Sequence, residues 1–168
     1  MQRRTVLRLG LASSVAIGLA GLAAAHWESP LRQGKLSLAS RNLFKSVGNA
    51  MLDGCLPVVA ADRAAALDGM VLRVEDLIRG LPGATQDELA ELLSVLSLGV
   101  GRAALFGLFS PFDQTPIPKL QAQLQAMRTS SLGLRQQVYH AFHDVVNSAY
   151  FADAGTWILM GYGGPIKL

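Results

Sequence analysis

The chain has 168 residues, of which 15 are basic and 12 acidic. Residues 1–25 hold three of the basic residues and none of the acids, so residues 26–168 carry equal numbers of the two charges. A net charge of zero excludes a typical nucleic-acid binder, which needs a basic excess to neutralise phosphates. The single cysteine, Cys55, excludes an intramolecular disulfide, and we expect it to be a small buried residue rather than a reactive thiol.

The first 25 residues have the pattern of an export signal. A basic start is followed by an uncharged run, residues 9–25, that ends in three alanines. Paired arginines before a hydrophobic and a further basic residue resemble the twin-arginine export consensus, and the alanines suit a signal peptidase. The residues that carry this motif are Arg3, Arg4, Leu7 and Arg8. An uncleaved membrane anchor is the alternative, but seventeen residues with three glycines fall short of the roughly 20 apolar residues of a span. We predict a signal peptide at 1–25 and one helical domain at 26–168.

In the first half of this domain, the sequence predicts a flexible lead-in at 26–36 followed by two helices. Apolar residues at helical spacing indicate a helix over 37–53, which Gly54 and Pro57 end. Residues 59–79 have the clearest amphipathic pattern. Their apolar stripe consists of Leu67, Met70, Val71, Val74, Leu77 and Ile78.

A capping box opens the next predicted helix. Thr85 and Glu88 have the spacing at which each side chain bonds the backbone N–H of the other residue. The helix then becomes apolar nearly all round, as a central buried helix would be. Because glycine is unfavourable inside helices, Gly99 and Gly101 predict the close approach of a neighbouring backbone. We expect Arg102, alone in this apolar run, to reach an acid or the surface.

Two more helices follow a proline-rich loop at 110–118. The first covers 118–128, and the second begins near Ser130 or Ser131 as N-cap and ends near Phe151. Its predicted apolar face consists of Leu134, Val138, Phe142, Val145, Ala149 and Tyr150. No alternating strand pattern appears in the sequence. We therefore predict an all-α fold, a single bundle of about five helices with an irregular aromatic C-terminal tail.

The last helix carries the one cluster that could support chemistry. His140 and His143 lie on a polar stripe with Gln136 and Asn147. Two imidazoles can share a metal ion, but a site needs further ligands, and no second motif supplies them. No nucleophile motif or phosphate-binding loop is present either. We interpret the stripe as a surface or partner interface and expect no catalytic, cofactor-binding or metal-binding residue in this chain.

The tail after this helix is rich in large aromatic residues. Tyr150, Trp157 and Tyr162 accompany a run of glycines that ends at Pro165. Such side chains bury well against a partner or against their own bundle, and aromatic residues are enriched at interface centres. The sequence by itself leaves both alternatives open.

The export signal and the chain's ending together resemble a known family. The ending consists of Leu-Arg-x-x-x-Tyr-x-x-Phe at 134–142, Ala-Tyr-Phe at 149–151, Trp157 and Gly-Tyr-Gly-Gly-Pro at 161–165. These motifs resemble the small subunits of periplasmic flavin dehydrogenases, the gluconate 2-dehydrogenase subunit 3-like group. The large subunits of that group are oxidoreductases of the glucose–methanol–choline type.

The resemblance implies a non-catalytic accessory subunit in the periplasm. It would assist maturation of an FAD-dependent sugar or alcohol dehydrogenase and export this signal-less partner through the twin-arginine translocase. FAD would belong to the partner, and a haem c subunit can join the complex; this chain has no C-x-x-C-H motif for covalent haem. Complexes of this kind can reach the membrane through such partners. The candidate partner interface consists of His140, His143, Tyr150, Trp157, Tyr162 and Pro165.

Two other functions stay open from the sequence. One is a stand-alone periplasmic helical enzyme, or a protein that binds a small ligand or metal through His140 and His143. The other is a helical scaffold that keeps residues 1–25 as its membrane anchor.

Overall fold

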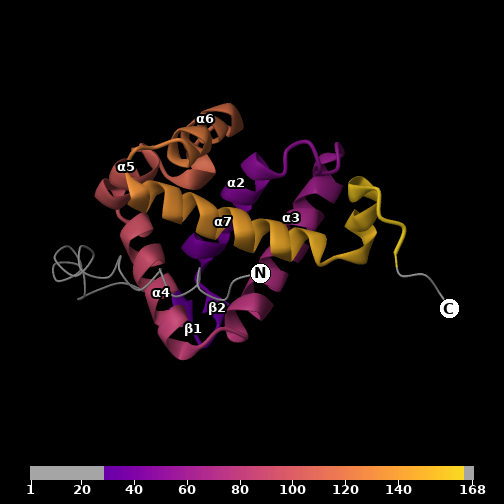
Figure 1. Ribbon diagram of the computed structural model, residues 1–168, viewed down its shortest axis with the longest axis horizontal. Coiled ribbons are helices and arrows are strands. Elements are labelled where there is room, and N and C mark those ends of the chain that lie inside the picture. Colours follow the sequence, from indigo (N-terminus) through magenta and orange to yellow (C-terminus); the bar gives the residue numbers. More distant parts are fainter. Residues whose placement is uncertain (1–28, 165–168) are drawn as a thin grey trace.

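The computed structural model describes residues 29–164 and confirms the predicted all-α class (Figure 1). Helix α7 runs through the middle of the molecule and contacts α2, α3, α5 and α6. The elements in chain order are β1 Leu31–Arg32, β2 Lys35–Leu36, α2 Leu38–Met51, α3 Ala60–Arg79, α4 Gly83–Ser97, α5 Gly99–Phe106, the 3-10 helix η2 Phe112–Gln114, α6 Ile117–Arg128, α7 Gly133–Phe151 and the 3-10 helix η3 Ala154–Met160.

Phenylalanines from four elements form the centre of the core. The ring of Phe142 on α7 lies 5.4 Å from Phe44 of α2 and 5.8 Å from Phe106 of α5. Phe106 in turn meets Phe112 of η2 edge to face at 5.0 Å. Tilted and edge-on pairs at these distances add to the stabilisation from burial alone. The helices are therefore joined around Phe142.

The segment predicted as a flexible lead-in contains a β-hairpin. Leu31 and Leu36 pair across it and are both buried, and the turn between them has left-handed backbone at Gln33 and Gly34. The carboxylate of Glu75 on α3, itself buried, accepts the N–H of Leu36 at 2.9 Å. The flexible lead-in was therefore wrong for 31–36, because burial of two leucines and this long-range bond order the segment.

The single apolar helix predicted from Thr85 is two helices, α4 and α5, bent by 102° at Leu98. A Cβ at Gly101 would lie 2.0 Å from the carbonyl oxygen of Val95, so only glycine fits there. Close backbone approach at Gly101 is thus confirmed, and the neighbour is the last turn of α4. Nothing comparable crowds Gly99, whose nearest contact is an arginine nitrogen at 3.8 Å.

The capping box predicted at the start of α4 was wrong. The helix begins at Gly83, and the N–H of Thr85 donates to the carbonyl of Pro82 at 3.0 Å, so Thr85 lies inside the first turn and forms no capping box. Arg102 was expected to reach an acid or the surface, and it is partly exposed. Its Nη1 donates to the carbonyls of Leu96 at 3.3 Å and Ser97 at 2.9 Å, which satisfies the end of α4.

Helices α6 and α7 match the predicted ranges closely. The cap of α7 differs, because Leu132 precedes the helix without a capping side chain. Ser130 accepts the N–H of Leu132 through its hydroxyl oxygen and so stabilises the turn before the helix. On the core face, the predicted Val145 is partly buried against the core, Val146 beside it is fully buried, and Leu134 is exposed.

Candidate partner interface at the end of helix α7

The chain turns sharply where α7 ends, and Asp153 makes the turn. This residue is the N-cap of η3, where its carboxylate accepts the N–H of Gly155 at 2.9 Å. The hydroxyl of Thr156 donates back to the carbonyl of Asp153 at 2.7 Å. The tail predicted to be irregular therefore contains a short, capped helix.

An arginine from another helix fixes this turn. The Nε–H of Arg73 on α3 donates to the carbonyl of Ala149 in the last turn of α7 at 2.6 Å. Its Nη1 lies 3.2 Å from the carboxylate of Asp153. A cation at a helix C-terminus is favourable because the last carbonyls carry partial negative charge. Arg73 thus joins α3, α7 and η3.

Trp157 holds η3 against the end of α7. Its indole is half-buried, and Nε1–H donates to the carbonyl of Phe151 at 2.9 Å. On the other side, the ring of Trp157 lies 5.4 Å from that of Tyr162. The indole is therefore shared between the chain's own bundle and the exposed tail.

The outer side of η3 is apolar and faces solvent. Ile158 is 74% exposed, and Leu159, Met160 and Tyr162 are each about half exposed. No residue of η3 is buried. We call the set Trp157, Ile158, Leu159, Met160 and Tyr162 the tail surface. Contiguous exposed apolar residues of this kind mark interaction sites on proteins.

Tyr150 does not belong to this surface, which corrects its assignment to a partner interface. It is buried at the end of α7, and its hydroxyl donates to the carbonyl of Cys55 at 2.8 Å. Burial raises the pKa of Tyr150 above its ordinary value of 10.0, and the neighbouring Cys55 and Asp153 act in the same direction. Tyr150 is a core residue that joins α7 to the turn after α2, where Cys55 is half-buried.

The two histidines lie apart from the tail surface. His140 and His143 are exposed on α7, and His143 lies about two turns before the helix ends. Nδ1 of His143 is 3.1 Å from the carboxylate of its neighbour Asp144, and the ring of Tyr139 contacts both imidazoles. Among residues 29–164, no three His, Cys, Asp or Glu side chains come together as metal ligands.

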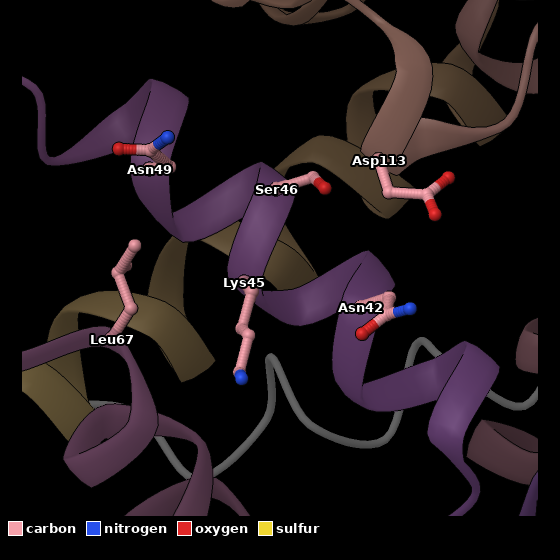
Figure 2. A pocket seen from close by; sticks show the side chains of 6 residues that line it. All are labelled: Asn42, Lys45, Ser46, Asn49, Leu67 and Asp113. Atoms are coloured by element: carbon pink, nitrogen blue, oxygen red, sulfur yellow. The ribbon is translucent and has the colours of Figure 1, made fainter. Parts of the chain in front are cut away.

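A shallow depression lies between α2, α3 and η2 (Figure 2). It encloses about 230 Å³, and its lining residues are Asn42, Lys45, Ser46, Asn49, Leu67 and Asp113. The ammonium group of Lys45 points away from Asp113 and pairs with Asp68 instead. The polar groups of the depression do not converge on one point, so it does not resemble a catalytic site.

Arg73 and Asp153 belong to the candidate interface, and the sequence analysis did not indicate either of them. An aspartate two residues before a glycine is a weak N-cap signal that could have located η3. Nothing in the sequence links Arg73 to a carbonyl 76 residues away. The remaining predicted residues, Arg3, Arg4, Leu7, Arg8 and Pro165, lie outside the described part of the chain.

No family model, curated protein or solved structure matches this chain. Within 29–164, no single helix has the length and hydropathy to cross a membrane. The bent pair of α4 and α5 meets both criteria when its two helices are taken together.

Proposed function

We propose that this chain is the non-catalytic small subunit of an exported FAD-dependent sugar or alcohol dehydrogenase complex. In this role it assists maturation of the catalytic subunit and carries that signal-less subunit through the twin-arginine translocase to the periplasm. FAD and the substrate site belong to the partner, and a haem c subunit can complete the complex. The proposal rests on the paired arginines at the start of the chain, the motif resemblance of its ending, and the tail surface.

The tail surface is the observation that carries the proposal. Three consecutive large apolar side chains, Ile158 to Met160, face solvent on a segment that Asp153 and Trp157 fix at its N-terminal end. Ordering this segment in advance lowers the entropy that a partner must remove on binding. Burying a large apolar side chain contributes about 1.5–3 kcal/mol. A partner groove that covers the tail surface would therefore gain several kcal/mol.

Affinity purification of the tagged full-length chain from its native host tests the proposal. We expect a dehydrogenase subunit to be recovered with it, identified by mass spectrometry and by the visible absorption of bound flavin. The variant Ile158→Ser should reduce recovery of this subunit. Leu38→Ser is the matched control, because Leu38 is 73% exposed on α2, away from the tail.

Three outcomes would contradict the proposal. If no flavoprotein were recovered with the wild-type chain, the proposed partner would be ruled out. If Ile158→Ser and Leu38→Ser reduced recovery of the subunit equally, the tail surface would not be the contact. Flavin absorption or a stoichiometric metal on the isolated chain would favour the stand-alone enzyme or metal-binding protein.

A further inference from the structure

The outward side of α5 is apolar, and it lies far from the tail surface. Val100 in its first turn is 73% exposed, and Phe109, just after the helix, is 83% exposed. Ala104 between them is also exposed. The one polar side chain of α5, Arg102, donates to the carbonyls at the end of α4. A solvent-facing helix side without a free polar group is unusual in a soluble protein.

The start of α7 extends this apolar region. Leu132 is 62% and Leu134 is 41% exposed. The Nε–H of Arg135 donates to the carbonyl of Leu105 at 2.9 Å, which joins the first turn of α7 to the last turn of α5. Figure 1 shows α5 and the start of α7 at one end of the molecule and η3 at the other. We call Val100, Phe109, Leu132 and Leu134 the α5 face.

Basic residues outnumber acidic ones in the sequence segment that contains the α5 face. Residues 92–143 contain four basic side chains and a single acid, Asp113, although the whole chain has 12 acids. Arg128 is exposed at the end of α6, four residues before Leu132, and its Nε–H donates to the neutral side chain of Gln125. In the part of the chain that the structure describes, Arg102, Arg128 and Arg135 form no salt bridge with a carboxylate.

We propose that the α5 face binds the surface of a membrane that contains anionic lipids. Phe109, Val100 and Leu132 enter the interfacial layer, and the arginine at 128 contacts lipid phosphates. Apolar and aromatic side chains bordered by basic residues that have no acidic partner are the composition of interfacial membrane-binding elements. The bent α4–α5 pair, which is apolar enough to meet the hydropathy criterion for a membrane span, points the same way.

This inference goes beyond the proposed function. The family resemblance implies that such a complex reaches the membrane through its other subunits, whereas the α5 face would give this chain a lipid contact of its own. The two surfaces lie at opposite ends of the bundle, so the chain can hold a partner and a membrane at once.

A fluorophore placed on the α5 face tests the lipid contact. The full chain with Cys55→Ser and Phe109→Cys is labelled with an environment-sensitive dye and mixed with vesicles of equal phosphatidylglycerol and phosphatidylcholine. We expect the emission at 109 to rise and shift to the blue, to do so far less with phosphatidylcholine alone, and to reverse in high salt. Labels at Ala65→Cys on α3 and Ile158→Cys on the tail should change little, because both positions lie away from this face.

A pair of charge variants tests the role of the arginine. One basic residue near an anionic surface contributes about 1 kcal/mol, so Arg128→Gln should weaken vesicle binding about fivefold. Lys119→Gln removes the same charge from the opposite end of α6 and should have a smaller effect. Circular dichroism of each variant verifies the fold, which substitutions at exposed positions are expected to leave intact.

The inference fails if the chain binds vesicles in a flotation assay while the emission of the dye at 109 stays unchanged, since the lipid contact would then lie elsewhere. It also fails if no vesicle is bound, or if binding does not depend on anionic lipid. A blue shift at 109 caused by the recovered dehydrogenase without vesicles would assign the α5 face to a protein.

Discussion

Arg73 and Ala149, 76 residues apart, are joined by a 2.6 Å hydrogen bond from the guanidinium Nε–H to a backbone carbonyl. The same guanidinium lies 3.2 Å from Asp153, the residue that caps η3. The orientation of the tail surface thus depends on a side chain of α3. A bond of this kind couples the packing of the bundle to the part of the chain that we propose a partner contacts.

Replacing Arg73 with methionine should loosen the tail and leave the helices folded. A hydrogen bond to a charged group contributes about 1.5–3 kcal/mol, and the partial exposure of this guanidinium lowers the expected loss to about 1–2 kcal/mol. Hydrogen exchange should accelerate in residues 154–162, and recovery of the dehydrogenase should fall. Lys45→Met, which breaks an exposed pair with Asp68, is the control and should do neither.

Alanine at Gly101 and at Gly99 should have opposite consequences. At Gly101 the added Cβ meets the carbonyl of Val95 at 2.0 Å, so the bend between α4 and α5 must change, at a cost of about 3 kcal/mol. At Gly99 there is open space, and alanine should be neutral or stabilise the helix by up to about 1 kcal/mol. Urea unfolding of the two variants measures the difference, and equal midpoints would contradict the backbone contact.

Tyr150→Phe should lower stability and alter its dependence on pH. Loss of the bond to the Cys55 carbonyl costs about 0.5–1.5 kcal/mol near neutral pH. The raised pKa of Tyr150 means that the folded state keeps the phenol proton which the unfolded state loses above about pH 10. The wild type should therefore lose stability as pH rises from 10 toward the folded-state pKa, and the variant should lack this decrease. Urea unfolding of both proteins at pH 9 and pH 11 measures this loss of stability. An equal decrease in the wild type and in Tyr150→Phe would contradict the prediction.

Changing both Arg3 and Arg4 to lysine should block export. Twin-arginine signals require the guanidinium pair, and lysine keeps the charge, so any loss reflects recognition of the pair. The protein and the signal-less partner that we propose for it should then remain in the cytoplasm, as measured by fractionation and blotting of both. Normal delivery of the double variant to the periplasm would remove the twin-arginine assignment.

Much of the helical framework could be predicted because apolar periodicity reflects burial directly. The stripe from Leu67 to Ile78 predicted α3 within a residue at each end. The hairpin gave no such signal, because two strands of two residues are too short to show a period. The bend at Leu98 also escaped prediction. Glycines at 99 and 101 indicate a close approach, but they do not reveal which backbone approaches.

Prediction of the candidate site succeeded less well, for a different reason. Aromatic residues near Trp157 look alike in sequence, although Tyr150 is buried and Tyr162 is about half exposed. That distinction is set by contacts distant in the chain, such as the carbonyl of Cys55 and the guanidinium of Arg73. Composition can locate such a surface along the chain, but it cannot separate the residues that face outward from those that pack inward.

The buried carboxylate of Glu75 determines where the ordered part of the described chain begins. Leu31, the first buried residue of the described chain, follows the predicted cleavage site at Ala25 by six residues, which span at most about 20 Å. The hairpin stays in place because Glu75, on α3, holds the N–H of Leu36. Without α3 in position, the hairpin would lose this bond, and the first element fixed to the bundle would be α2, which begins at Leu38. The position of the first fixed residue thereby becomes a measure of folding that a protease probing residues 29–37 can read.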